Sequence, residues 1–103
     1  MGRIVVVGSL NMDLVFRVAR APAAGETLTG RSFSTAPGGK GANQAIACAR
    51  MGASVAMVGC VGADDFGATL RQGLIADGVE ATLVTQVGDA PTGVALVMVE
   101  DGG

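Results

Sequence analysis

A glycine-rich segment with the sequence GGKGANQ, residues 38–44, has the residue types that point most directly to ligand binding. An alanine-rich stretch with helical spacing follows it, so we expect the segment to open a helix, where free backbone N–H groups and a partial positive charge are available. Glycines let a ligand approach the backbone closely, Lys40 adds a cation, and Asn43 offers both a donor and an acceptor. This chemistry suits a polyhydroxylated or anionic small molecule. The alternative is a tight loop that only leads into a helix.

The glycine-rich segment matches neither of the two common phosphate-binding motifs. A Walker A loop needs Ser or Thr after Gly-Lys, whereas Gly41 follows Lys40. A dinucleotide fingerprint needs GxGxxG directly after a strand, and neither residues 39–44 nor residues 8–11 fit it. The segment is therefore not assigned to nucleotide phosphate.

A second candidate group, Asn11, Met12 and Asp13, comes shortly after the β-branched run at residues 4–7. Ligands of open α/β sheets bind beyond the carboxyl ends of the strands. A carboxylate at that place can accept hydrogen bonds from two neighbouring sugar hydroxyls. The alternative is an Asx turn that serves only the backbone.

Composition excludes several classes of function. Half of the 103 residues are hydrophobic and 16% are charged, which predicts one small folded domain rather than a disordered chain. The net charge of −2 argues against a nucleic-acid partner. The sequence also lacks the run of about 20 apolar residues that a membrane span would need. The absence of His excludes His-based triads and His metal sites. The two cysteines, Cys48 and Cys60, lack CxxC spacing and are predicted to be core thiols. No signal segment opens the sequence, so we expect a cytoplasmic protein.

Strand and helix patterns alternate along the chain and predict an α/β fold with βαβ units and a parallel sheet. The run at 4–7 is predicted to be a buried central strand, 41–51 a helix, and Asp64 or Asp65 the cap of a second helix. The more polar strand patterns at about 14–18, 27–36 and 92–99 predict a separate, small antiparallel layer. Residues 100–103 have the residue types of a hairpin turn, after which another strand is expected. We therefore expect the chain to be the N-terminal part of a longer protein.

Five segments, in this order, resemble the ribokinase-like (phosphofructokinase-B-type) carbohydrate kinases. They are the opening strand with GSLNMD at 8–13, PAAGET at 22–27, GGKGANQA at 38–45, VGCVGADDFG at 58–67 and PTGVA at 91–95. The GGKGANQ segment is specific, whereas the GET and PTG pieces are individually weak. The resemblance implies that residues 1–103 are the N-terminal part of a single sugar-kinase domain, a three-layer α/β/α fold with a small antiparallel β lid.

The resemblance also implies a substrate and a site. It implies ATP-dependent phosphorylation of D-ribose to ribose 5-phosphate, with Asn11 and Asp13 on the ribose hydroxyls, Gly39 and Lys40 lining the pocket, and Asn43 adding a hydroxyl contact. The neighbouring Met12, Gly41 and Ala42 belong to the same implied substrate-binding set. The lid is implied to close over the sugar, to exclude water from the reaction, and to join two copies into a homodimer.

Residues 1–103 lack the other half of that machinery. The family's Gly-Ala-Gly-Asp-type segment, which carries the catalytic aspartate, and its magnesium-linked acidic motif do not occur here. We therefore expect the catalytic base and the sites for ATP, Mg²⁺ and K⁺ to lie beyond residue 103, and the chain alone to be inactive. Two alternatives remain open: another small-sugar or nucleoside kinase, such as a fructokinase or adenosine kinase, and a non-catalytic module that binds a polyol.

Overall fold

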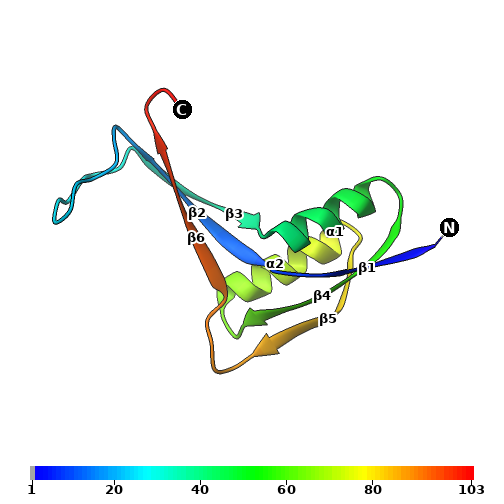
Figure 1. Ribbon diagram of the computed structural model, residues 1–103. Helices are drawn as coiled ribbons and strands as arrows, with labels where there is room; N and C mark the ends of the chain where they lie inside the picture. The colour runs from blue at the N-terminus through cyan, green and yellow to red at the C-terminus, as the bar shows by residue number, and fades with distance from the viewer. Residues whose placement is uncertain (1) are drawn as a thin grey trace.

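The computed structural model describes residues 2–103, which form two three-stranded sheets and two helices. The elements are β1 (Arg3–Val7), β2 (Asn11–Val18), β3 (Ser32–Gly38), α1 (Lys40–Arg50), β4 (Ser54–Gly62), α2 (Asp65–Ala76), β5 (Glu80–Val87) and β6 (Gly93–Glu100). One sheet, in the order β1-β4-β5, forms a body with both helices, and the other, in the order β3-β2-β6, projects from it as an arm (Figure 1). We call these the body and the lid. No helix within residues 2–103 is long and apolar enough to cross a membrane.

The body is a parallel sheet, as the alternating pattern predicts. β4 pairs with β1 on one side and with β5 on the other, both in parallel. Both helices pack on the same face of this sheet, because one core cluster contains residues of α1, of α2 and of the strands between them: Ala42, Ala45, Val55, Met57, Leu70 and Leu74. The observed α1 starts and ends one residue before the predicted helix at 41–51.

The other face of the body sheet is uncovered in this chain. Val5 and Val7 of β1 are 56% and 77% exposed, and Leu83 of β5 is 58% exposed. The run at 4–7 is a strand as predicted, but within residues 2–103 it lies at the sheet edge and is not buried. Cys60, predicted to be a core thiol, is exposed, whereas Cys48 is half-buried. These side chains of the body strands are exposed because both helices pack on the other face of the sheet.

The lid is a mixed sheet. The expected antiparallel pairing is present between β2 and β3, whereas β6 runs parallel to β2, from Asn11 opposite Gly93 to Val18 opposite Glu100. β6 takes this direction because the chain enters it from the body, at the end of the lid where β2 also begins (Figure 1). The strand expected at 27–36 begins only at Ser32, and residues 27–31 belong to the preceding loop.

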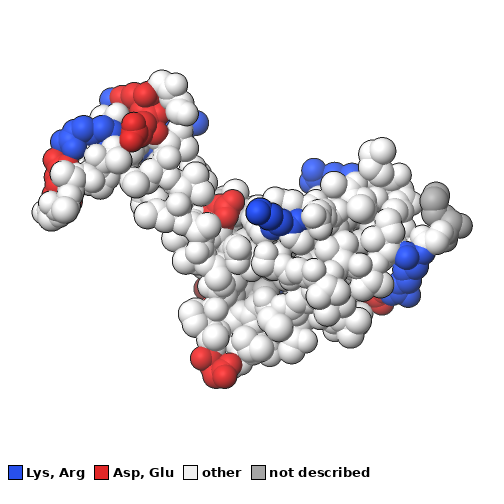
Figure 2. Space-filling view, in the orientation of Figure 1, with Lys and Arg blue, Asp and Glu red and all other residues white. Residues whose placement is uncertain are grey.

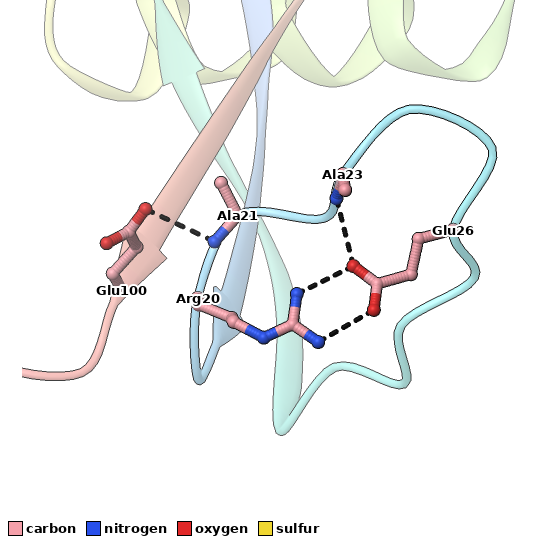
Figure 3. Close-up of polar contacts among 5 residues, drawn as sticks. All are labelled: Arg20, Ala21, Ala23, Glu26 and Glu100. Atoms are coloured by element: carbon pink, nitrogen blue, oxygen red, sulfur yellow. Dashed lines mark hydrogen bonds and ion pairs between the residues drawn. The ribbon is translucent and has the colours of Figure 1, made fainter.

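The loop at the far end of the lid is held by a charged network (Figure 3). Arg20 donates to both carboxylate oxygens of Glu26, at 2.6 and 2.7 Å, and the Ala23 N–H donates to the same side chain at 2.9 Å. Glu100 of β6 accepts from the Ala21 N–H at 3.2 Å. The visible surface shows acidic and basic side chains gathered at this end, whereas those on the rest of the molecule are more scattered (Figure 2). The Arg20 guanidinium, followed by the Ala23 N–H, lowers the pKa of Glu26 to about 2.

This network predicts a specific acid response. Because the pKa of Glu26 is depressed from 4.5 to about 2 in the folded protein, the network contributes stability above pH 4.5 and loses it as the pH falls toward 2. Arg20→Gln removes the main cause, so the pKa of Glu26 should return most of the way to its ordinary value. Carboxyl-carbon NMR titration of the protein measures this pKa directly. Arg17→Gln, on an exposed arginine of β2, is the control; an unchanged Glu26 pKa in Arg20→Gln would contradict the assignment.

Candidate functional site

The candidate site lies where the chain crosses between the body and the lid. The β1–β2 connection and the start of α1 touch through bare backbone: a Cβ added to Gly41 would lie 2.7 Å from the Gly8 Cα. The Ala42 N–H also donates to the Ser9 carbonyl at 3.1 Å. Glycine at both positions therefore allows the start of β2 and the tip of α1 to approach each other.

Asp13 faces the tip of α1. Its half-buried carboxylate lies against Gly38, so that a side chain at position 38 would fall on the carboxylate oxygens. In the lid register, Asp13 lies opposite Ala36 on β3 and Ala95 on β6. Side chains opposite each other in adjacent strands share a face of the sheet. The carboxylate is therefore flanked by two small side chains that leave room for a ligand beside it.

Asn11 lies on the same face of β2 as Asp13, because side chains two residues apart in a strand point the same way. Its neighbour in the register is Gly93, the first residue of β6. A Cβ at Gly93 would lie 2.5 Å from the Asn11 Oδ1, so the Asn11 amide occupies the space above that glycine. Asn11 and Asp13 thus each lie against a glycine from a neighbouring strand.

The tip of α1 is formed by Gly39, which has a φ of +99° and caps the helix without a side-chain hydrogen bond. A Cβ at this position would lie 2.5 Å from the Ser9 carbonyl oxygen. Lys40 and Asn43 are exposed within the first turn, and the Asn43 N–H donates to the Gly39 carbonyl at 2.9 Å. The helix tip therefore presents backbone, a cation and an amide side chain, as the sequence predicts.

Three residues of the predicted substrate-binding set have little or no free side chain. Met12 is 2% exposed and packs in the core, because it points to the face of β2 opposite Asp13. Gly41 and Ala42 are buried at the crossing of the two segments. These residues place the backbone of the site, and any contact of theirs with a ligand would come from main-chain atoms. The sugar-binding roles assigned to the whole set remain predictions.

A hollow of about 610 Å³ opens beside this crossing, at the carboxyl ends of β1 and β4. Asn11 and Gly93 line it together with residues of the β1–β2 connection, Gly8, Ser9 and Leu10, and of the body sheet, Val7, Val58, Gly59, Cys60, Leu83 and Thr85. Its volume lies within the range of small-molecule sites, and its place is where ligands of α/β sheets bind. Asp13 and Lys40 are not among its walls, so the hollow and the carboxylate are neighbours rather than one closed cavity.

Comparison with known proteins decides the family. The sequence profile described as "pfkB family carbohydrate kinase" matches residues 1–103. The chain belongs to this family. It is 48% identical to the ribokinase of Schizosaccharomyces pombe, over 97% of this chain and 33% of that protein. It is 47% identical to the ribokinase of Bacillus subtilis, over 99% of this chain and 35% of that protein.

Solved structures of pfkB-family kinases have the same fold. The ribokinase of Arabidopsis thaliana complexed with ribose and ATP superposes with a TM-score of 0.89 at 38% identity, over 97% of this chain and 33% of that one. The ribokinase of Cryptococcus neoformans in complex with ADP gives 0.88 at 35% identity, over 100% and 32%. The predicted α/β fold class is thereby confirmed, and the chain spans about one third of the length of the curated relatives it matches.

Residues 2–103 do not fit the Mg²⁺ ion that membership of this kinase family implies. Within this part of the chain, no three His, Cys, Asp or Glu side chains are grouped as metal ligands would be. A divalent ion would have to be held by other parts of the protein. What they can do is hold hydroxyl groups and shape a pocket.

One set of contacts was not predicted as part of the site. Asp64 was expected only as a helix cap, and it does cap α2 by accepting from the Gly67 N–H at 2.8 Å. It also binds Thr92 of the PTG segment, which precedes β6. The sequence contains both the VGADDFG segment and the PTG segment, but neither of them indicates that the two segments are in contact.

Proposed function

We propose that the protein containing this chain is an ATP-dependent ribokinase, which converts D-ribose to ribose 5-phosphate, and that this chain supplies its sugar-binding side. The observation that carries the proposal is the contact of the Asp13 carboxylate with Gly38, directly before the tip of α1. It brings an acceptor for sugar hydroxyls next to a helix tip that carries Lys40 and Asn43. The ribokinases at 47–48% identity and the related structure complexed with ribose and ATP support the choice of sugar.

The proposed roles follow from the chemistry of the side chains. An ionised carboxylate accepts hydrogen bonds from two hydroxyls at once, which matches the adjacent hydroxyls of a pentose. Asn11 adds an amide on the same face of β2, and Asn43 adds a second at the helix tip. The lid strands β3 and β6 flank Asp13, so a sugar held there would be covered by the lid and shielded from water.

The phosphate donor belongs to the rest of the protein. ATP is supported as the donor by the ribokinases of Arabidopsis thaliana and Cryptococcus neoformans, whose structures contain ATP and ADP respectively. We propose that Mg²⁺ and K⁺ accompany it, that the catalytic base lies beyond residue 103, and that the protein works in the cytoplasm. When bound, the divalent ion would neutralise charge on the transferring phosphoryl group.

A second candidate function is phosphorylation of a related sugar or nucleoside. The chain is 38% identical to the deoxyribokinase of Salmonella typhi, and an aminoimidazole riboside kinase of Salmonella enterica superposes with a TM-score of 0.73 at 30% identity. That 38% is below the 48% and 47% identities to the two curated ribokinases described above, and the TM-score of 0.73 is below the 0.89 and 0.88 of the two ribokinase structures. Ribose is therefore the preferred substrate of the proposal.

A substrate panel tests the proposed function. The full-length protein is assayed with ATP and, in turn, ribose, 2-deoxyribose, fructose and adenosine, while calorimetry measures ribose binding to the same preparation. We expect the highest kcat/KM with ribose. A higher kcat/KM with another acceptor would replace ribose by that acceptor, and ribose binding without turnover would favour a non-catalytic polyol-binding module. Residues 1–103 alone, which lack the expected base, should give no turnover.

We also propose that the lid joins two copies of the protein. Its face opposite Asp13 is apolar and exposed: Phe33, Val94, Leu96 and Met98 are 57%, 54%, 66% and 44% exposed. The register aligns Leu14 with Leu96 and Phe16 with Met98, which makes this face continuous across the sheet. An exposed apolar face of this kind is typical of a protein–protein contact. A second lid with the same face is the partner that matches it.

The dimer proposal predicts the effect of a charge on that face. Leu96→Glu would bury a carboxylate without a partner at the contact, so the full-length protein should sediment as a monomer. Ser34→Glu introduces the same charge on the opposite face of the lid and is the control, which should sediment as a dimer. Sedimentation velocity measures both. A Leu96→Glu variant that remains dimeric would place the contact elsewhere.

A further inference from the structure

Thr92 is the only buried polar or charged side chain identified in residues 2–103, at 4% exposure, and it lies where the chain leaves the body for the lid. Its hydroxyl donates to Asp64 Oδ1 at 2.6 Å, and its backbone N–H donates to Asp64 Oδ2 at 2.9 Å. The same hydroxyl accepts from the Gly62 N–H at 2.8 Å. Asp64 in turn caps α2 at Gly67. One threonine therefore binds the end of β4 and the start of α2.

Two glycines make this contact possible. A Cβ at Gly62 would collide with the Thr92 backbone nitrogen, and a Cβ at Gly67 would lie 2.9 Å from the Thr92 Oγ1. The body thus presents backbone without side chains where Thr92 packs against it. The Thr92 hydroxyl and then its N–H, together with the Gly67 N–H, hold the pKa of Asp64 below its ordinary value, so the carboxylate stays ionised in this contact.

The contact lies one residue from the candidate site. Gly93 follows Thr92, begins β6, and pairs with Asn11, whose amide rests on it. Two residues further on, Ala95 flanks Asp13. The position of Thr92 on the body therefore sets where β6 starts beside Asn11 and Asp13.

We propose that Asp64 and Thr92 form a clasp that fixes the pivot of lid strand β6, and that both are positioning residues for the sugar site. The proposal rests on the proposed function for its substrate. Neither side chain needs to touch the sugar. Their effect is to keep Gly93 and Ala95 in place beside Asn11 and Asp13 while the rest of the lid moves. Loss of the clasp lets β6 shift, and small displacements of a binding group weaken a site strongly.

The first test separates positioning from folding. In the full-length protein, Thr92→Val keeps the shape of the side chain but loses the hydroxyl, and we expect the KM for ribose to rise about tenfold with kcat and the KM for ATP nearly unchanged. Thr92→Ser keeps the hydroxyl and should restore the KM to within about twofold. Asp64→Asn should behave like Thr92→Val, because the amide cannot accept both Thr92 bonds. Asp65→Asn changes the neighbouring carboxylate, which caps nothing, and is the matched control.

The second test needs no substrate. Hydrogen exchange of the β6 amides is compared in the same full-length variants without sugar. Thr92→Val and Asp64→Asn should speed exchange in β6 several-fold, whereas Thr92→Ser and Asp65→Asn should not. If the wild-type protein does not phosphorylate ribose, the proposed function fails while faster β6 exchange still supports the clasp.

One pattern overturns the proposal. A variant that is thermally less stable but keeps the wild-type KM and the wild-type β6 exchange would show that the contact is structural only. If Thr92→Val does not fold, Asp64→Asn decides by the same two measurements.

Discussion

Asp13→Ala in the full-length protein is expected to raise the KM for ribose by about 10-fold to 100-fold. A hydrogen bond to a charged group contributes about 1.5–3 kcal/mol, and each 1.4 kcal/mol is a factor of ten in affinity. The half-buried Asp13 has Ala36 and Ala95 as its cross-strand neighbours, and neither side chain offers an acceptor that could replace the carboxylate. Steady-state kinetics with ribose as the varied substrate measures the change.

The control for Asp13→Ala is another aspartate of the same part of the chain. Asp101 follows β6, is exposed, and pairs with Arg31 at 2.6 Å at the far end of the lid. An exposed ion pair contributes little, so Asp101→Ala should leave the KM for ribose near the wild-type value. An equal KM in Asp13→Ala and Asp101→Ala would remove Asp13 from the sugar site and with it the observation on which the proposed function depends.

The parts of the site that the sequence predicted are those fixed by local rules. Glycines before an amphipathic alanine-rich stretch predict a helix start, and α1 begins at Lys40 as expected, within one residue. The strand expected at about 14–18 is present within β2, and its alternation continues to Met12, which is buried on the face opposite Asp13. These patterns need only the periods of helix and strand.

The parts that could not be predicted depend on long-range contacts. A strand pattern is the same whether its neighbour runs parallel or antiparallel, so the direction of β6 follows from the path of the chain and not from residues 92–99. The clasp joins residues 28 apart, and neither Asp64 nor Thr92 alone signals it. The burial of a strand such as β1 depends on both sheet faces, and the elements of this chain cover one.

The second large effect is expected from Gly39→Ala. Gly39 has a φ of +99°, which L-residues with a side chain adopt at a cost of about 1–3 kcal/mol. In addition, the new Cβ would lie 2.5 Å from the Ser9 carbonyl oxygen, against backbone that cannot rotate away. Relief of this overlap would push the tip of α1 from the start of β2. The full-length variant should therefore lose stability and also bind ribose more weakly.

The matched control for Gly39→Ala is Gly52→Ala, at the other end of α1. Gly52 has a φ of +92°, but a Cβ there meets nothing within 4 Å. Both variants place a side chain at a positive φ, but only Gly39→Ala adds the overlap with Ser9, so its free energy of unfolding should fall further than that of Gly52→Ala. Overpacking of this kind costs about 1–3 kcal/mol. Urea unfolding gives that difference, and the KM for ribose should rise in Gly39→Ala alone. Equal stability and equal KM in the two variants would mean that the α1 tip can move without cost, which contradicts a site built on its contact with β2.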